Sequence, residues 1–71
     1  MKRYLVVVEP TGSGFSAYSP DLPGCISTGR TRAEVEANIR EAIEFHIEGL
    51  RREGLPIPEP SSASTYVDVA A

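Results

Sequence analysis

Apolar side chains recur along this chain first at a spacing of two residues and then at a spacing of three or four. Residues 3 to 9 are rich in β-branched and aromatic types, which is typical of a strand, and apolar side chains lie on both of its faces. Residues 15 to 19 predict the return strand of a hairpin, and residues 25 to 28 predict a short third strand. We therefore expect a small antiparallel or mixed sheet that begins in the first part of the chain.

A long amphipathic helix is predicted within residues 29 to 58. Thr31 stands three residues before Glu34, the spacing of a capping box in which each side chain satisfies the other residue's free backbone amide. Gly54, followed by Pro56, predicts the end of the helix. The apolar stripe of the helix consists of Val35, Ile39, Ala42, Ile43, His46 and Leu50, with Ile47 on its flank.

Proline and glycine residues predict a sharp turn before the helix and an extended arm after it. Pro23 and Gly24 suit the two central positions of a type II turn, and Asp21 is expected to form an Asx-type bond within that turn. Residues 55 to 60 predict a polyproline-like arm, and residues 64 to 70 alternate well enough for a last strand. The predicted fold is thus α+β, in the order β-β-β-α-β, with the helix packed on one face of the sheet.

Length and composition narrow the range of functions. Seventy-one residues allow one domain, 1 to 71, with a small core. Because one helix covers only one face of a sheet whose first strand is apolar on both faces, we expect a second copy of the chain or a partner on the other face, most simply in a homodimer. The formal net charge of −3 argues against nucleic-acid binding and is compatible with a basic partner protein.

The cysteine content and the length of the apolar runs indicate the cellular compartment that we expect for this chain. Cys25 stands alone, so no intramolecular disulfide is possible, and a reducing cytoplasmic setting is expected. No apolar run is long enough to span a membrane. The chain has no Gln and a single Asn, a depletion that is seen in some thermophile proteins and that chance also produces in short chains.

Few residues are candidates for chemistry, and each has a structural alternative. His46 could act in acid–base catalysis, but its place in the apolar stripe favours a core histidine with a hydrogen-bonded ring. Cys25 could be reactive, but no basic neighbour is evident, which favours a buried small side chain. Asp21, Glu9 and Asp68 could hold a divalent metal only if they converged. We therefore expect no catalytic residues, no metal and no cofactor.

One face of the helix is a candidate partner interface. Phe45 lies roughly 120° from the centre of the apolar stripe on a helical wheel. It is either a partly exposed aromatic or an anchor in an interface, where aromatic side chains are enriched. With Glu41 and Glu48 it forms a candidate site for a basic partner, and the edge of the sheet is a second possible docking surface.

Three ordered motifs resemble the HicB-like antitoxin family of toxin–antitoxin systems. They are Tyr18-Ser-Pro-Asp-Leu-Pro-Gly-Cys25, then Gly29-x-Thr31-x-x-Glu34-x-x-x-Asn38, then Gly54-x-Pro-Ile-Pro58. The resemblance covers nearly the whole chain and implies a partial ribonuclease-H-like domain that binds a small basic HicA-type toxin and blocks the active site with which that toxin cleaves mRNA. The residues expected to form its turn and caps are Asp21, Pro23, Gly24, Gly29, Thr31, Glu34 and Gly54.

Two features differ from the pattern of the family. Many members carry a further helix-turn-helix or ribbon-helix-helix segment that binds their own promoter, whereas this chain ends at Ala71, directly after the last predicted strand, so we expect no DNA-binding domain. Arg30 stands where the family often has an acidic residue. Three functions stay open: a non-catalytic module that neutralises a toxin, which is favoured, an oligomeric regulatory or ligand-binding scaffold without a cognate toxin, and a nuclease suggested by fold analogy alone.

Overall fold

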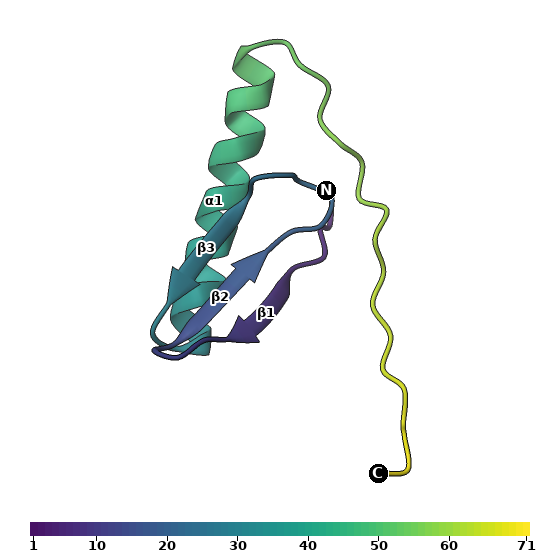
Figure 1. The fold of residues 1–71 in the computed structure, drawn as a ribbon. Helices are drawn as coiled ribbons and strands as arrows, with labels where there is room; N and C mark the ends of the chain where they lie inside the picture. The colour runs from purple at the N-terminus through teal and green to yellow at the C-terminus, as the bar shows by residue number, and fades with distance from the viewer.

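The N-terminal part of the molecule is a three-stranded antiparallel sheet, in a computed structural model that describes all residues from 1 to 71. The strands β1 (Val7–Pro10), β2 (Phe15–Tyr18) and β3 (Ile26–Gly29) lie side by side in the order β1-β2-β3 (Figure 1). The first strand begins later than predicted, because the opposing chain turns away at Pro20, which has no amide proton to donate. The hydroxyl of Ser19 instead donates to the carbonyl of Leu5 at 3.0 Å.

A single long helix, α1 (Arg32–Arg52), covers one face of this sheet, as predicted (Figure 1). It packs mainly on β3 and β2 and least on β1. At its start the hydroxyl of Thr31 accepts a hydrogen bond from the amide of Glu34 at 3.1 Å. The Glu34 carboxylate accepts from the amide of Arg30 at 3.1 Å, and not from that of Thr31, so the predicted capping box forms with one of its two bonds shifted by a residue. The helix does not combine the length and apolar character needed to cross a bilayer.

Glycine sets both the turn before α1 and the end of the helix. Gly24 has a φ of 81°, and the amide of Cys25 donates to the carbonyl of Leu22 at 3.1 Å, which confirms the predicted type II turn. Gly54 has a φ of 67°, and the amide of Leu55 donates to the carbonyl of Leu50 at 2.9 Å, the bonding of a Schellman cap. Gly29 leaves no room for a side chain, because a Cβ there would lie 2.5 Å from the amide nitrogen of Val35 in the first turn of α1.

The buried core lies under the N-terminal half of α1. Val35 and Ile39 are buried against the sheet, whereas Leu50 is only half-buried. Figure 1 shows why: the C-terminal half of the helix projects past the end of the three strands. The predicted apolar stripe is therefore confirmed in the first half of the helix and is left partly uncovered in the second. The fully packed cluster consists of Ala17, Leu22, Cys25, Val35 and Ile39.

The segment after the helix has no regular secondary structure. Residues 55–60 form the extended arm that their prolines predict. The last strand predicted over residues 64–70 does not form, since no backbone hydrogen bond joins any residue beyond Leu55 to the rest of the chain. Side chains attach the arm instead: Lys2 pairs with Glu59, and the hydroxyl of Tyr4 donates to the carbonyl of Pro58 at 2.6 Å. Residues 61–71 are all exposed.

Candidate partner interface

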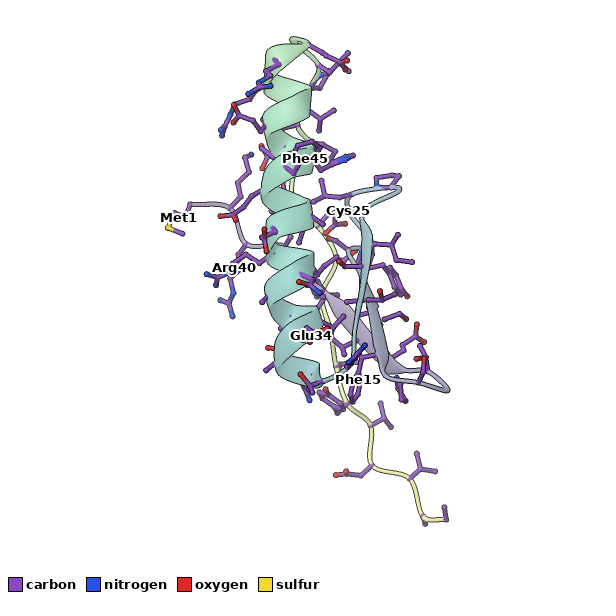
Figure 2. The ribbon with its side chains drawn as sticks, turned by 90° about the vertical axis from the view of Figure 1, so that its left-hand side faces the viewer. Met1, Phe15, Cys25, Glu34, Arg40 and Phe45 are labelled. Carbon is purple, nitrogen blue, oxygen red and sulfur yellow. The ribbon has the colours of Figure 1, made fainter.

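Glu41, Phe45 and Glu48 lie together on the solvent-facing side of α1. Their spacing of four and then three residues places them on one stripe of a helix, and all three are exposed. Phe45 is 82% exposed, although it stands in the middle of a well-formed helix (Figure 2). An aromatic ring left in water at this site contributes nothing to the core of the chain, so the structure leaves it free to act as an anchor for a partner.

The negative charge of this stripe is not uniform. The carboxylate of Glu48 lies 3.7 Å from the guanidinium of Arg52, one turn further along the helix, and is partly neutralised by it. Glu41 and, on the adjacent face of the helix, Glu44 form no ion pair. Of the two carboxylates of this stripe, only that of Glu41 is without an ion-pair partner, and it lies one turn before Phe45.

A shallow groove of about 410 Å³ adjoins Phe45 on the side of the sheet. Phe45 and His46 line it from α1, and Ile26 lines it from β3. His46 is half-buried and its ring makes none of the side-chain hydrogen bonds of the structure, so the prediction of a core histidine with a hydrogen-bonded ring is wrong. The ring lines this shallow groove and is not enclosed in the core.

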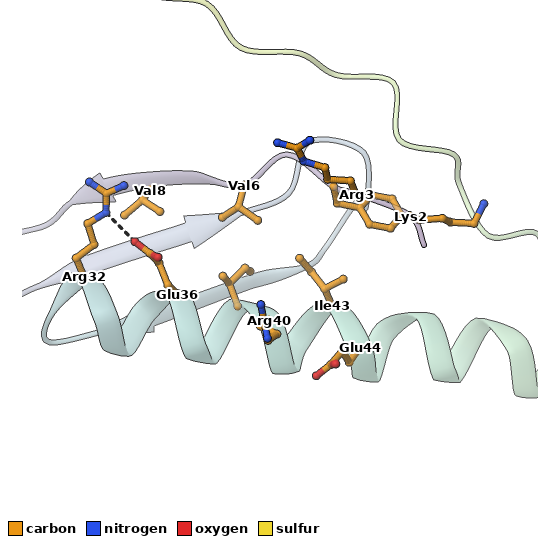
Figure 3. A pocket seen from close by; sticks show the side chains of 11 residues that line it. Lys2, Arg3, Val6, Val8, Arg32, Glu36, Arg40, Ile43 and Glu44 are labelled. Carbon is orange, nitrogen blue, oxygen red and sulfur yellow. Dashed lines mark hydrogen bonds and ion pairs between the residues drawn. The ribbon is translucent and has the colours of Figure 1, made fainter.

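A second groove, of about 480 Å³, runs between β1 and α1 (Figure 3). Its apolar lining comes mainly from Val6 and Val8 on one side and from Ile39 and Ile43 on the other. It stays open because the helix packs least on β1. Its charged residues are mostly basic: Lys2, Arg3, Arg32 and Arg40 against Glu36 and Glu44.

Asp21 ties the arm to the loop between β2 and β3. Its carboxylate accepts hydrogen bonds from the amide and the hydroxyl of both Ser61 and Ser62, at 2.8 to 3.1 Å. The amide of Ser62, the hydroxyl of Ser62 and then the groups of Ser61 hold the pKa of Asp21 below its ordinary value of 3.8. The predicted Asx-type bond within the turn is therefore wrong, because the carboxylate points to the arm.

The remaining candidates for chemistry do not converge. Cys25 is 5% exposed, and burial raises the pKa of its thiol, so it is the buried small side chain that was predicted and not a reactive thiolate. Glu9 lies on β1, Asp21 is bonded to the arm, and Asp68 lies in the exposed tail. No group of three or more metal-ligating side chains is present.

Sequence reasoning missed the contact between Asp21 and the two serines. The signal was present in the Ser61-Ser62 pair that follows the last proline of the arm, since two adjacent hydroxyls and amides can chelate one carboxylate. Nothing in the spacing, however, indicates which of the carboxylates of the chain they meet.

The sequence of this chain matches a known family along almost its whole length. The family described as HicB_like antitoxin of bacterial toxin-antitoxin system has a model that matches residues 4–70. The chain belongs to this family. The predicted resemblance is thereby confirmed, and the sheet and helix described above confirm the α+β fold class.

Several relatives share the HicB-like sequence. An uncharacterized 14.9 kDa protein of Haemophilus phage HP1 is 35% identical over 65 residues, which cover 92% of this chain and 49% of that protein. The UPF0150 protein Ta0767 of Thermoplasma acidophilum is 34% identical over 66 residues, which cover 92% of this chain and 96% of that protein. The chain thus spans about half the length of the phage relative and nearly the full length of the archaeal one.

Two solved structures have the same fold. A chain of the HicA3 and HicB3 toxin-antitoxin complex superimposes with a TM-score of 0.73 at 40% identity, covering 84% of this chain and 70% of that chain. The antitoxin HicB3 crystal structure gives a TM-score of 0.70 at 40% identity, covering 84% of this chain and 44% of that chain. The sheet and helix described above are therefore those of HicB antitoxins.

Proposed function

We propose that this HicB-like chain is a non-catalytic antitoxin module that binds a small basic HicA-type toxin and neutralises it by occluding the active site with which the toxin cleaves mRNA. The observation that supports this most strongly is the fold similarity, at 40% identity, to a chain of a complex of HicA3 with HicB3. The one cysteine of the chain, Cys25, is a buried free thiol, which suits a reducing cytoplasm.

The docking surface we assign is the stripe of Glu41, Phe45 and Glu48. Aromatic side chains are enriched among the residues that carry most of the binding energy of interfaces, and Phe45 is exposed on a rigid helix. The two carboxylates beside it would attract a basic partner and orient its approach. The groove between β1 and α1 suits a basic toxin less well, because four cationic side chains and only two carboxylates line it.

Direct binding of DNA is not part of the proposed function of residues 1–71. The net charge of −3 gives no overall electrostatic attraction for phosphates, and the stripe of Glu41, Phe45 and Glu48 on α1 carries carboxylates where a DNA-reading helix would carry basic residues. We therefore expect neither cleavage of RNA nor binding of promoter-like DNA by the isolated chain at physiological salt.

The decisive experiment measures RNA cleavage by a small basic HicA-type ribonuclease, taken from the same genome, with and without this chain. Stoichiometric addition should abolish cleavage. If no such ribonuclease loses activity, the antitoxin proposal fails, and the alternative of an oligomeric scaffold without a cognate toxin is favoured.

Association kinetics test the assigned surface. The double variant Glu41→Lys/Glu48→Lys should slow association by about tenfold at low salt and flatten its salt dependence. Phe45→Ala should instead speed dissociation by about tenfold, as expected for an aromatic anchor. The single variants Glu41→Lys and Glu9→Lys form the matched pair, since each changes the net charge equally at an exposed position that forms no ion pair, and Glu9 lies on β1, away from the stripe. Equal effects of these two variants would show that the toxin binds elsewhere.

A further inference from the structure

The tail that follows Ser62 has the side-chain pattern of a strand but no neighbouring strand to pair with. Over residues 64–70 apolar and polar side chains alternate, with Val67 and Val69 on one side and Tyr66 and Asp68 on the other. Tyr66 is 98% exposed, and Val67 and Val69 are each 77% exposed. Three of the seven residues in this segment are large, apolar and mostly exposed to water. Such an exposed apolar segment is typical of an interaction site.

The edge of β1 is a matching strand without a neighbour. β1 pairs with β2 on one side only, and its other edge borders the groove between β1 and α1. A strand that paired with this edge would place alternate side chains above the groove, where Val8, Ile43 and their neighbours form an apolar floor (Figure 3). The free edge of β3 also borders a groove, which Ile26 and Phe45 line, but that groove adjoins the stripe assigned above to the toxin.

Charge favours the same pairing. Arg32 is neutralised by Glu36 and Lys2 by Glu59, which leaves Arg3 and Arg40 against the one unpaired carboxylate of Glu44, so the groove keeps a small positive excess. The tail carries one charged side chain, the carboxylate of Asp68. A basic groove disfavours the basic toxin proposed above and attracts this acidic tail.

The path of the chain directs the tail away from its own sheet. Asp21 holds Ser61 and Ser62, and from there the tail passes clear of β1 and runs beyond the end of the sheet (Figures 1 and 2). It forms no backbone hydrogen bond with β1 of the same chain. The molecule is consequently 49 Å long in its longest dimension, although a helix of 21 residues spans only about 32 Å.

We propose that residues 64–70 of one copy pair as a fourth strand with the β1 edge of a second copy, with Val67 and Val69 placed in the groove between β1 and α1 of that copy. Two chains exchange their tails about a twofold axis, so that each accepts one strand and gives one. Such an exchange is closed: it leaves neither a free β1 edge nor an exposed apolar tail. It also enlarges a core that, in one chain, buries only six residues.

The direct test is a filtered nuclear Overhauser experiment on a mixture of isotope-labelled and unlabelled full-length chains. Cross-peaks are expected between the methyl groups of Val67 or Val69 in one chain and those of Val8 or Ile43 in the other. The proposal is overturned if the same contacts occur only within one chain, which means that the tail folds back on its own sheet. It is equally overturned if residues 64–70 keep the chemical shifts of an unstructured peptide.

Sedimentation of variants gives an independent test. The wild-type chain should be dimeric at micromolar concentration, and Val67→Asp should weaken dimerisation by about tenfold or more, because it would place a charge over an apolar floor. Ala63→Asp adds the same charge to the tail, outside the pairing segment, and should leave dimerisation unchanged. A monomeric wild type, or equal effects of the two substitutions, rejects the exchange.

This inference does not rest on the proposed antitoxin function. Val67→Asp leaves Glu41, Phe45 and Glu48 intact, so it should still inhibit the toxin, whereas Phe45→Ala should lose toxin affinity and remain dimeric. If the wild-type chain is monomeric and still inhibits the toxin, the exchange of tails is wrong and the toxin-binding surface stands. If the wild-type chain dimerises as proposed but Phe45→Ala inhibits the toxin as well as the wild type does, the toxin-binding surface alone is rejected.

Discussion

The body of the molecule and its C-terminal arm are ordered by different forces. Residues 4–54 form hydrogen-bonded strands and a helix around buried side chains, whereas no side chain of residues 55–71 is buried. The arm follows a defined path because prolines stiffen it and because Lys2, Tyr4 and Asp21 hold it at three points. A segment without buried apolar side chains adds little to the free energy of unfolding. The body and the arm should therefore respond to different perturbations.

The largest effect is expected from a charge in the core of the body. Ile39 is 3% exposed, so Ile39→Asp buries an unpaired carboxylate and should cost on the order of several kcal/mol, comparable to the total stability of a small domain. Leu50 is only half-buried, so Leu50→Asp should cost about 1–2 kcal/mol. Urea denaturation followed by circular dichroism measures both, and equal losses would mean that the two halves of α1 are equally covered.

The junction between the body and the arm can be tested with two glycines. Gly54 has a positive φ, so Gly54→Ala should destabilise the chain by about 1–2 kcal/mol. Gly49 lies within α1, and a Cβ there would meet nothing within 4 Å, so Gly49→Ala should stabilise the chain by about 0.5–1 kcal/mol. Thermal denaturation compares the two variants. Changes of the same sign would contradict the Schellman end of the helix.

Acid should release the arm before it affects the strands of the body. The hydrogen bonds of Ser61 and Ser62 depress the pKa of Asp21, so they stabilise the attached arm above the ordinary pKa of 3.8. This stabilisation is lost as the pH falls from that value through the lower pKa of the folded state. The amide chemical shifts of Ser61 and Ser62 should follow this titration. In Asp21→Asn the same shifts should not depend on pH in this range, and if they do, another group controls the attachment.

The smallest effect is expected on the exposed face of the helix. Glu44 is exposed and forms no ion pair, so Glu44→Gln should change the free energy of unfolding by less than about 0.5 kcal/mol. The same urea titration used for Ile39→Asp measures it. A loss of more than about 1 kcal/mol would indicate that Glu44 contacts a group of the body that stabilises the fold.

Local signals in the sequence were sufficient for most of the body. The type II turn at Pro23-Gly24, the cap at Thr31 and the end of the helix at Gly54 each depend on residues a few positions apart. Backbone sterics and hydrogen bonds within one turn of chain decide their geometry. The spacing of the residue types along the sequence is therefore enough to predict them. The exposed stripe of Glu41, Phe45 and Glu48 was predictable for the same reason, since helical periodicity determines which residues share a face.

Only the tertiary structure decided which apolar side chains are buried and which predicted strand finds a neighbour. Alternation over residues 64–70 describes a strand, but a strand needs a neighbour, and in this chain the path of the arm provides none. His46 fits the apolar stripe of α1, yet it is only half-buried and lines an open groove. The bond between Asp21 and Ser61 joins groups 40 residues apart. Burial and long-range hydrogen bonds depend on where distant segments meet in space, and the order of residue types along the chain does not specify that meeting.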